Sequence, residues 1–227
     1  MDIHLSCTEK GYGEPLVLLH GNGENGGYFA HQLEYFSKRL RVIAVDTRGH
    51  GKSPRGDKPF TIVQFAEDLL NFLDEHNIEK PDILGFSDGA NIALTFALKH
   101  PERVARLILN SGNLSPDGVK RRIQIPIEIG YKIASKFAEK SPGAKKNAEL
   151  LGLMVNEPNI SPDELSAIKA KTLVIAGTRD MIKDSHTELI GESIPNARTV
   201  KIKGNHFIAN KNPEEFNRAV EEFLEEK

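Results

Sequence analysis

Hydrophobic and polar positions along this chain repeat in an order of short apolar runs followed by longer helical patterns. Continuous apolar runs, such as residues 16–20, predict strands buried on both faces of a sheet. The predicted strands cover 3–8, 16–20, 42–45, 81–84, 104–109, 172–176 and 199–202. Apolar residues recur at helical spacing in 61–76, 90–98, 184–192 and 213–225, and 30–40 is amphipathic. This alternation predicts an α/β protein with a mostly parallel, twisted sheet and helices on both faces.

The alternation stops between residues 112 and 171. Two helical patterns fill this stretch, one carrying Ile125, Ile129, Ile133 and Phe137 and the other carrying Ala148, Leu151 and Val155. We therefore expect residues 1–111 and 172–227 to form a core, and 112–171 to form a helical lid over the strand ends. The isoleucine-rich face either packs on the body of the protein or lines a pocket. The basic cluster 120–122 is interpreted as solvated surface.

Composition excludes several classes of function. The 227 residues include 30 basic and 32 acidic ones, a net charge of −2, so we expect no nucleic-acid partner. The start of the chain lacks a signal-peptide pattern and no apolar run reaches about 18 residues, which predicts a cytoplasmic protein with no membrane partner. Cys7 is the only cysteine, so neither an intrachain disulfide nor a cysteine zinc site is possible, and we interpret it as a half-buried apolar residue.

A sharp turn between a predicted strand and a predicted helix carries a candidate nucleophile. Residues 85–89 read Gly-Phe-Ser-Asp-Gly, with Ser87 at the apex. Glycine two positions to either side lets the strand and the helix pass closely, and the serine is expected to have a strained backbone. Its hydroxyl would stand at a helix N-terminus, where free N–H groups favour the negative charge of an acyl-transfer intermediate.

A glycine-rich loop, residues 20–27, follows another buried strand. Such loops point backbone N–H groups at a ligand, either as oxyanion donors or as a phosphate cradle. Phosphate is disfavoured because the loop lacks a P-loop ending and contains Glu24 instead of a lysine. We interpret His20 as a residue that shapes this loop by hydrogen bonding.

A serine nucleophile needs an imidazole base and a carboxylate that orients it. Asp180 and His206 each follow a late strand, and the chain order Ser, Asp, His suits a fold of this kind. Asp184 is a rival acid, interpreted as a helix N-cap. Four other histidines fall on or beside helices and are interpreted as surface groups: His31, His76, His100 and His186.

With these segments in place, the chain resembles the α/β-hydrolase-fold serine hydrolases. Residues 20–23 resemble the His-Gly oxyanion loop of that family, 46–53 its Asp-x-Arg-Gly-x-Gly-x-Ser signature, and 85–89 its nucleophile elbow. Asp180 and the segment 204–207 match the acid and base segments, so the resemblance spans the chain apart from the lid. It implies an acyl-enzyme on Ser87, with oxyanion stabilisation by the backbone N–H groups of Asn22 and Asp88.

Asp88 departs from the apolar residue or glutamine that is commoner beside the nucleophile. A carboxylate facing the oxyanion would cost about 4 kcal/mol at about 4 Å and an effective dielectric of about 20. The Ser-Asp-Gly form resembles that of valacyclovir-hydrolase-like esterases, which suggests that Asp88 binds an ammonium group of the substrate. The alternative is a structural hydrogen-bonding role.

The sequence therefore predicts a serine hydrolase, a carboxylesterase acting on small esters, with no metal or organic cofactor. The resemblance covers other chemistries as well, because thioesterases and carbon–carbon bond hydrolases use the same triad. Epoxide hydrolases and dehalogenases are disfavoured because they carry aspartate where this chain has Ser87. A ligand-binding or signalling protein on a hydrolase scaffold is the alternative from another class. The expected partner is a small-molecule ester, and a monomer and a homodimer both remain open.

Overall fold

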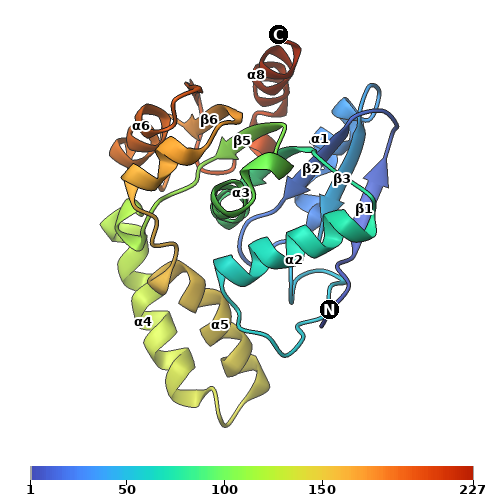
Figure 1. Cartoon of the computed structure of the whole chain (residues 1–227). Coiled ribbons are helices and arrows are strands. Elements are labelled where there is room, and N and C mark those ends of the chain that lie inside the picture. Colours follow the sequence, from blue (N-terminus) through green and yellow to red (C-terminus); the bar gives the residue numbers. More distant parts are fainter. Residues whose placement is uncertain (1, 227) are drawn as a thin grey trace.

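A single seven-stranded sheet forms the centre of the molecule in the computed structural model, which describes residues 2–226 (Figure 1). The strands are β1 (Cys7–Lys10), β2 (Pro15–Leu19), β3 (Arg41–Val45), β4 (Asp82–Phe86), β5 (Arg106–Asn110), β6 (Lys171–Gly177) and β7 (Ala197–Ile202). Their order across the sheet is β1-β3-β2-β4-β5-β6-β7. Only β1 runs antiparallel, against β3, and the other neighbours are parallel. The predicted α/β architecture is confirmed.

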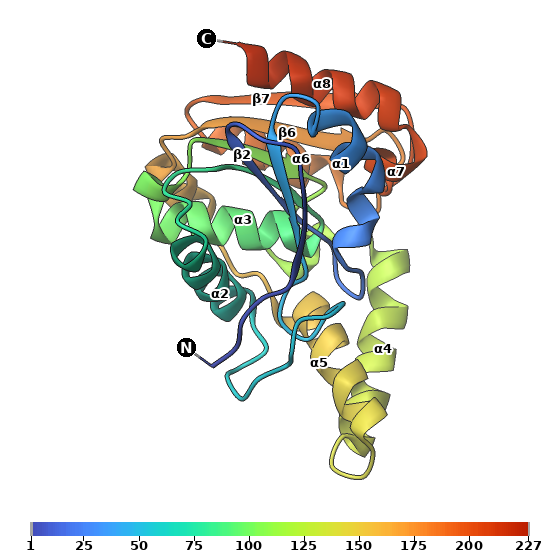
Figure 2. The same cartoon turned by 90° about the vertical axis from the view of Figure 1, so that its right-hand side faces the viewer.

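Helices cover both faces of the sheet and bury two apolar cores (Figures 1 and 2). One core lies beneath α2 (Ile62–Glu75), α3 (Asp88–Lys99) and α6 (Asp184–Ser193), and the other beneath α1 (Ala30–Phe36), α7 (Ile208–Lys211) and α8 (Pro213–Glu225). Alternate residues of each strand serve alternate cores: Val17 packs on the first side and Leu18 on the second. This explains the continuous apolar runs, since a strand covered on both faces has no polar side. Short 3-10 helices occur at Gly26–Phe29, Pro101–Arg103, Pro116–Gly118 and Pro162–Ala167.

The parallel strands end at one edge of the sheet. The pairing aligns Leu19 with Gly85, Phe86 with Asn110, and Gly177 with Ile202. The loops that follow these strands carry His20, Ser87, Ser111, Asp180 and His206. Because carboxyl ends of parallel strands converge, side chains more than a hundred residues apart meet at this edge.

Two antiparallel helices, α4 (Arg121–Phe137) and α5 (Pro142–Asn156), lie between β5 and β6 in the chain. They pack side by side and project from the body as a hairpin (Figures 1 and 2). Within residues 2–226, the isoleucine-rich face of α4 neither packs on the body of the protein nor lines a pocket, which were the two expected positions. Its four apolar side chains point to solvent, with exposed fractions of 40% for Ile125, 53% for Ile129, 57% for Ile133 and 47% for Phe137. The turns of α4 that face α5 carry other residues, such as Gly130 against Leu151.

Two element boundaries differ from the prediction by four residues. The edge strand begins at Cys7 rather than at residue 3, because its partner β3 ends at Val45, directly opposite Cys7. Cys7 is half-buried, as expected. The amphipathic segment 30–40 is helical only to Phe36, and a turn then redirects the chain into β3. No helix between residues 2 and 226 combines the length and apolar character needed to cross a membrane.

Candidate active site

Ser87 occupies the turn between β4 and α3. Its backbone has φ 54° and ψ −120°, a conformation that strains a non-glycine residue by about 1–3 kcal/mol. The flanking glycines allow the turn, since a Cβ on Gly85 would lie 2.2 Å from the Gly89 carbonyl oxygen. A Cβ on Gly89 would lie 2.0 Å from the Leu19 carbonyl oxygen. Close backbone packing therefore fixes the strained turn that projects the Ser87 hydroxyl.

Three side chains from separate loops meet at this hydroxyl. Ser87 Oγ lies 3.0 Å from His206 Nε2, and His206 Nδ1 lies 2.7 Å from Asp180 Oδ1. A carboxylate only accepts hydrogen bonds, so the imidazole proton resides on Nδ1 and leaves Nε2 free to accept the serine proton. The structure thus brings together the predicted nucleophile, base and acid in hydrogen-bonding order.

Asp180 is 2% exposed and is held by several donors. Burial alone would raise its pKa, but hydrogen bonds from His206, Ser111 and the backbone N–H of Ile182 outweigh burial and lower the pKa to about 2. Ser111 Oγ donates to Asp180 Oδ2 at 2.7 Å, and the Gly177 N–H donates to the same oxygen at 3.1 Å. Asp180 is therefore a carboxylate at neutral pH and keeps the imidazole in the required tautomer.

The sequence reasoning missed two residues that support Asp180. Ser111 directly follows β5 and has a positive φ of 58°. Its position after a predicted parallel strand could have indicated that it lies at the same edge of the sheet as Asp180. Lys120 Nζ donates to the Asp180 carbonyl oxygen at 2.6 Å. The interpretation of 120–122 as solvated surface is therefore wrong for Lys120, although Arg121 and Arg122 are exposed.

The glycine-rich loop lies directly against Ser87. A Cβ on Gly21 would approach the Phe86 ring to 3.0 Å and Ser87 Cβ to 3.2 Å. His20 shapes the loop as predicted: its Nε2 accepts the Thr47 N–H at 3.0 Å, so Nδ1 carries the proton and donates to the Gly21 carbonyl at 2.7 Å. Burial lowers the pKa of His20 to about 4, which keeps it neutral. The loop, with Asn22 in it, is thus held beside Ser87.

The segment 46–53 holds the glycine-rich loop in place by hydrogen bonds. Asp46 accepts the backbone N–H groups of Gly26 and Lys52, each at 2.8 Å, and Nε2 of His50 accepts the N–H of Gly23 at 3.1 Å. Arg48 is fully buried and forms a bidentate pair with Asp68, with both N–O distances at 2.7 Å. The signature residues are therefore scaffold for the loop rather than reacting groups.

Asp88 follows the nucleophile and is 9% exposed. Its Oδ1 accepts a long hydrogen bond of 3.4 Å from Asn91, whereas Oδ2 has no partner among residues 2–226. Burial raises the pKa of Asp88 to about 6, with a smaller raising effect from Glu157 and lowering effects from His206, Asn22 and Asn91. A buried carboxylate oxygen without a donor is costly, and it is an unfilled hydrogen-bonding position beside Ser87.

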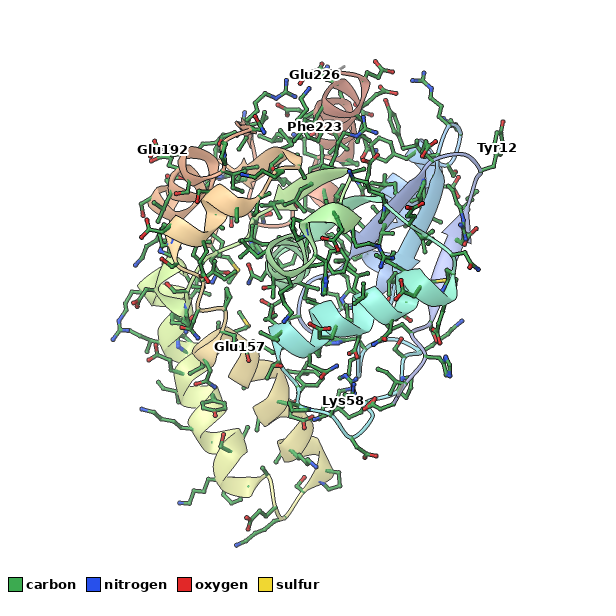
Figure 3. The ribbon with its side chains drawn as sticks, viewed as in Figure 1. Tyr12, Lys58, Glu157, Glu192, Phe223 and Glu226 are labelled. Carbon is green, nitrogen blue, oxygen red and sulfur yellow. The ribbon has the colours of Figure 1, made fainter. Side chains whose placement is uncertain are left out.

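Two further carboxyl groups lie near the same edge. Burial raises the pKa of Glu24, and proximity to His206 counters part of that rise. Its Oε2 is buried without a partner among the described residues. Glu157 lies where the end of α5 meets the start of α2 and accepts the N–H of Ile62 at 2.6 Å (Figure 3). The surroundings of Ser87 are therefore acidic.

The rival residues have other roles or positions. Asp184 is the first residue of α6 instead of its N-cap, which is Lys183, and its carboxylate pairs with Lys201 at 3.1 Å. Only His31 of the four helix-associated histidines is exposed. The surface interpretation is wrong for the other three, which are half-buried against their helices: His76, His100 and His186. His76, for example, contacts the Phe72 ring and carbonyl of its own helix.

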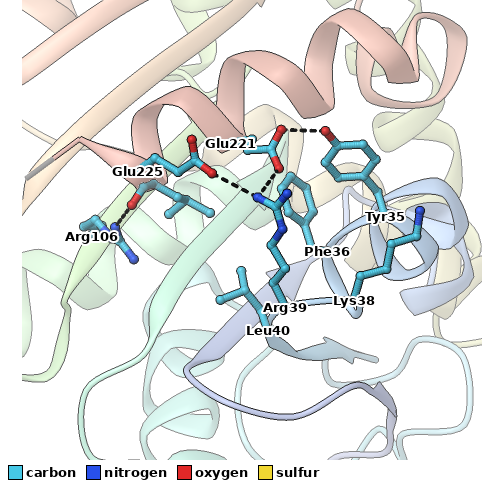
Figure 4. Close-up of a pocket in the computed structure, with 9 residues that line it drawn as sticks. Tyr35, Phe36, Lys38, Arg39, Leu40, Arg106, Glu221 and Glu225 are labelled. Atoms are coloured by element: carbon cyan, nitrogen blue, oxygen red, sulfur yellow. Dashed lines mark hydrogen bonds and ion pairs between the residues drawn. The ribbon is translucent and has the colours of Figure 1, made fainter.

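Two of the cavities lie away from Ser87. One of about 250 Å³ lies between α1 and α8, and three of its charged groups pair with one another (Figure 4). Arg39 contacts Glu221 at 3.0 Å and Glu225 at 2.9 Å there, which indicates a structural ion-pair network. A second, of about 440 Å³, lies between the α4–α5 hairpin and the segment before α2 and reaches Glu157. No group of three or more metal-ligating side chains occurs within residues 2–226.

Comparison with known proteins agrees with this geometry. The chain is 28% identical over 246 residues to a relative named carbamate hydrolase RutD from Caulobacter sp. (strain K31), covering 93% of this chain and 90% of the relative. It is 27% identical over 252 residues to serine hydrolase BPHL of Mus musculus, covering 98% and 84%. A solved thermophilic esterase from Thermogutta terrifontis has a TM-score of 0.83 at 25% identity, covering 98% of this chain and 93% of that one.

A family model described as alpha/beta hydrolase fold matches residues 14–141, which is more than half of the chain. The match includes the glycine-rich loop, the segment 46–53 and the turn at Ser87. The two relatives above, which match over at least 84% of either chain, carry hydrolase names. The chain therefore belongs to the alpha/beta hydrolase family, as its sequence predicted.

Proposed function

We propose that this protein is a serine hydrolase, a carboxylesterase that cleaves small esters through an acyl-enzyme on Ser87. The observation that carries the proposal is the continuous hydrogen-bonded chain from Ser87 Oγ to His206 at 3.0 Å and from His206 to Asp180 at 2.7 Å. Such a chain is what a hydroxyl needs to become a nucleophile at neutral pH.

The reaction divides into two steps. His206 Nε2 takes the Ser87 proton as the oxygen attacks the ester carbonyl, and the imidazolium formed is stabilised by the Asp180 carboxylate. The backbone N–H groups of Asn22 and Asp88 are the proposed oxyanion donors. His206 then gives its proton to the leaving alcohol, and the same base activates a water that releases the acyl group. The proposed reaction needs no metal or organic cofactor.

We further propose that the substrate carries a positively charged group, such as the ammonium of an amino acid ester, which Asp88 binds. The long contact with Asn91 is a weak structural role for a buried carboxylate, and the unpartnered Oδ2 supports a role in binding a donor. Glu24, with its own unpartnered oxygen, adds negative potential at the same edge.

Reaction with a fluorophosphonate probe tests the nucleophile. Wild-type protein should be labelled and Ser87→Ala should not, while Ser185→Ala, on the exposed surface of α6, should be labelled like wild type. A panel of p-nitrophenyl esters, amino acid esters and thioesters of different acyl lengths then identifies the bond cleaved. Labelling without turnover of any substrate would favour the ligand-binding alternative. Preference for a thioester or a carbon–carbon bond would replace the carboxylesterase assignment.

The ammonium proposal has a separate test. We expect Asp88→Asn to lower kcat/KM for an amino ester by about tenfold or more, while changing it little for the deaminated analogue. Equal losses for both substrates would reject recognition by Asp88 and leave the esterase proposal intact.

A further inference from the structure

The outer face of helix α4 carries an apolar strip that no other part of the described chain covers. Ile125, Ile129, Ile133 and Phe137 are each at least 40% exposed. They follow one another every fourth residue, so the strip runs for about 18 Å along the helix and turns by about 40° at each step. Contiguous exposed apolar surface of this kind marks an interaction site more often than chance.

Basic residues share this face with the apolar ones. Lys132 and Lys136 lie about 20° to either side of Ile125 around the helix axis, and both are exposed. Lys140, Lys145 and Lys146 lie at the tip of the hairpin, where α4 gives way to α5, and the last two line a cavity that faces Arg55 and Phe60 of the body. None of these five lysines forms an ion pair with any residue from 2 to 226. Exposed apolar groups and positive charge without an ion-pair partner therefore occur together on α4 and at the tip of the hairpin.

The charge of the hairpin contrasts with that of the rest of the chain. Residues 120–156 contain eight basic and three acidic side chains, a net charge of +5, whereas the whole chain carries −2, so the remainder carries −7. A second copy placed lid against lid would oppose two positive surfaces, which is unfavourable. A lid placed against the acidic body of another copy would be a head-to-tail contact, which extends into a filament unless the rotation closes a ring.

We infer that the outer face of α4 and the tip of the α4–α5 hairpin dock on an anionic phospholipid bilayer. Such a surface supplies the two properties that the strip requires, because acyl chains accept the isoleucines and Phe137 while lipid phosphates accept the lysines. The aliphatic stems of lysine allow both contacts at once. The hairpin projects beyond the body, so it can meet a flat surface without obstruction (Figures 1 and 2). This inference departs from the sequence-based expectation of no membrane partner.

Binding to vesicles tests the inference without using enzymatic activity. We expect wild-type protein to co-sediment with vesicles containing phosphatidylglycerol, to bind much less to vesicles of phosphatidylcholine alone, and to dissociate as salt is raised. Ile129→Ser combined with Ile133→Ser should weaken partitioning by about tenfold, because it removes apolar contact without changing charge. Lys132→Gln combined with Lys136→Gln should weaken it by about thirtyfold.

Matched controls lie outside the hairpin. Val63→Ser removes an apolar side chain of α2 that is 51% exposed, and Lys80→Gln removes an exposed charge, so both should bind like wild type. Unchanged circular dichroism of each variant establishes that it is folded. Failure of the wild type to bind phosphatidylglycerol vesicles overturns the inference, as does binding that neither double variant reduces. A concentration-dependent dimer that the isoleucine variant dissociates would also overturn it, because a second copy would then occupy the strip.

Discussion

The buried carboxyl of Asp88 makes the stability of this protein depend on pH in a calculable way. Its pKa rises from 3.8 to about 6 on folding, chiefly because burial disfavours the charged form. The folded state therefore holds this proton to higher pH than the unfolded state does. The contribution to stability is complete below about pH 4 and is lost as the pH rises to about 6, a total of about 3 kcal/mol.

Replacing Asp88 by asparagine removes this pH-dependent loss of stability, because the amide does not titrate. We expect Asp88→Asn to gain about 3 kcal/mol of unfolding free energy relative to wild type between about pH 4 and about pH 7. The new amide nitrogen lacks a hydrogen-bond partner, which lowers the unfolding free energy of the variant by the same amount at every pH. The diagnostic quantity is therefore how the difference in unfolding free energy between variant and wild type changes with pH.

Urea denaturation of both proteins across this pH range measures the change, because all other titrating groups are common to them and cancel. The control is Ser185→Ala, which changes an exposed side chain that does not titrate, so the difference from wild type should not vary with pH. A constant difference for Asp88→Asn, or one that moves in favour of the wild type as the pH rises, would refute the reasoning.

Three further predictions concern the scaffold of the site. Ser111→Ala removes a donor to Asp180, so kcat should fall by about tenfold with little change in KM, and the acidic limb of the kcat/KM profile should move to higher pH. Arg48→Met leaves Asp68 buried without its partner and should lower the unfolding free energy by about 3–5 kcal/mol in urea titrations. Gly89→Ala brings a Cβ within 2.0 Å of a carbonyl oxygen of β2, so little folded protein should be recovered.

Each of these changes has a control or a contrary result. Gly143→Ala, on α5, meets only a side-chain oxygen 3.8 Å away and should fold normally. Replacing Arg48 and Asp68 together by apolar residues should recover part of the stability that the single change loses. An unchanged kcat for Ser111→Ala would mean that Asp180 needs no help from the hydroxyl, and a loss below about 1 kcal/mol for Arg48→Met would mean that the ion pair contributes little.

Local patterns were enough to bring the candidate site residues together. Strand-length apolar runs located the strands along the chain, and residues directly after those runs were expected at the carboxyl edge of the sheet. Ser87, Asp180 and His206 could be proposed together for that reason, although the distances between them could not. The glycines at 85 and 89 likewise indicated that backbone segments pack closely at this turn, because any other residue would add a Cβ for which there is no space.

The sequence alone determined the class of fold, the edge of the sheet at which the candidate site residues lie, and the identity of the residues that follow each strand. Only the tertiary structure decided what surrounds them: the hydroxyl of Ser111 and the amine of Lys120 on Asp180, the unpartnered oxygen of Asp88, and the solvent-facing isoleucines of α4. Periodicity states which residues of a helix share a face, but not whether another part of the chain covers that face. Coverage and pairing depend on contacts between distant segments, which no local pattern encodes.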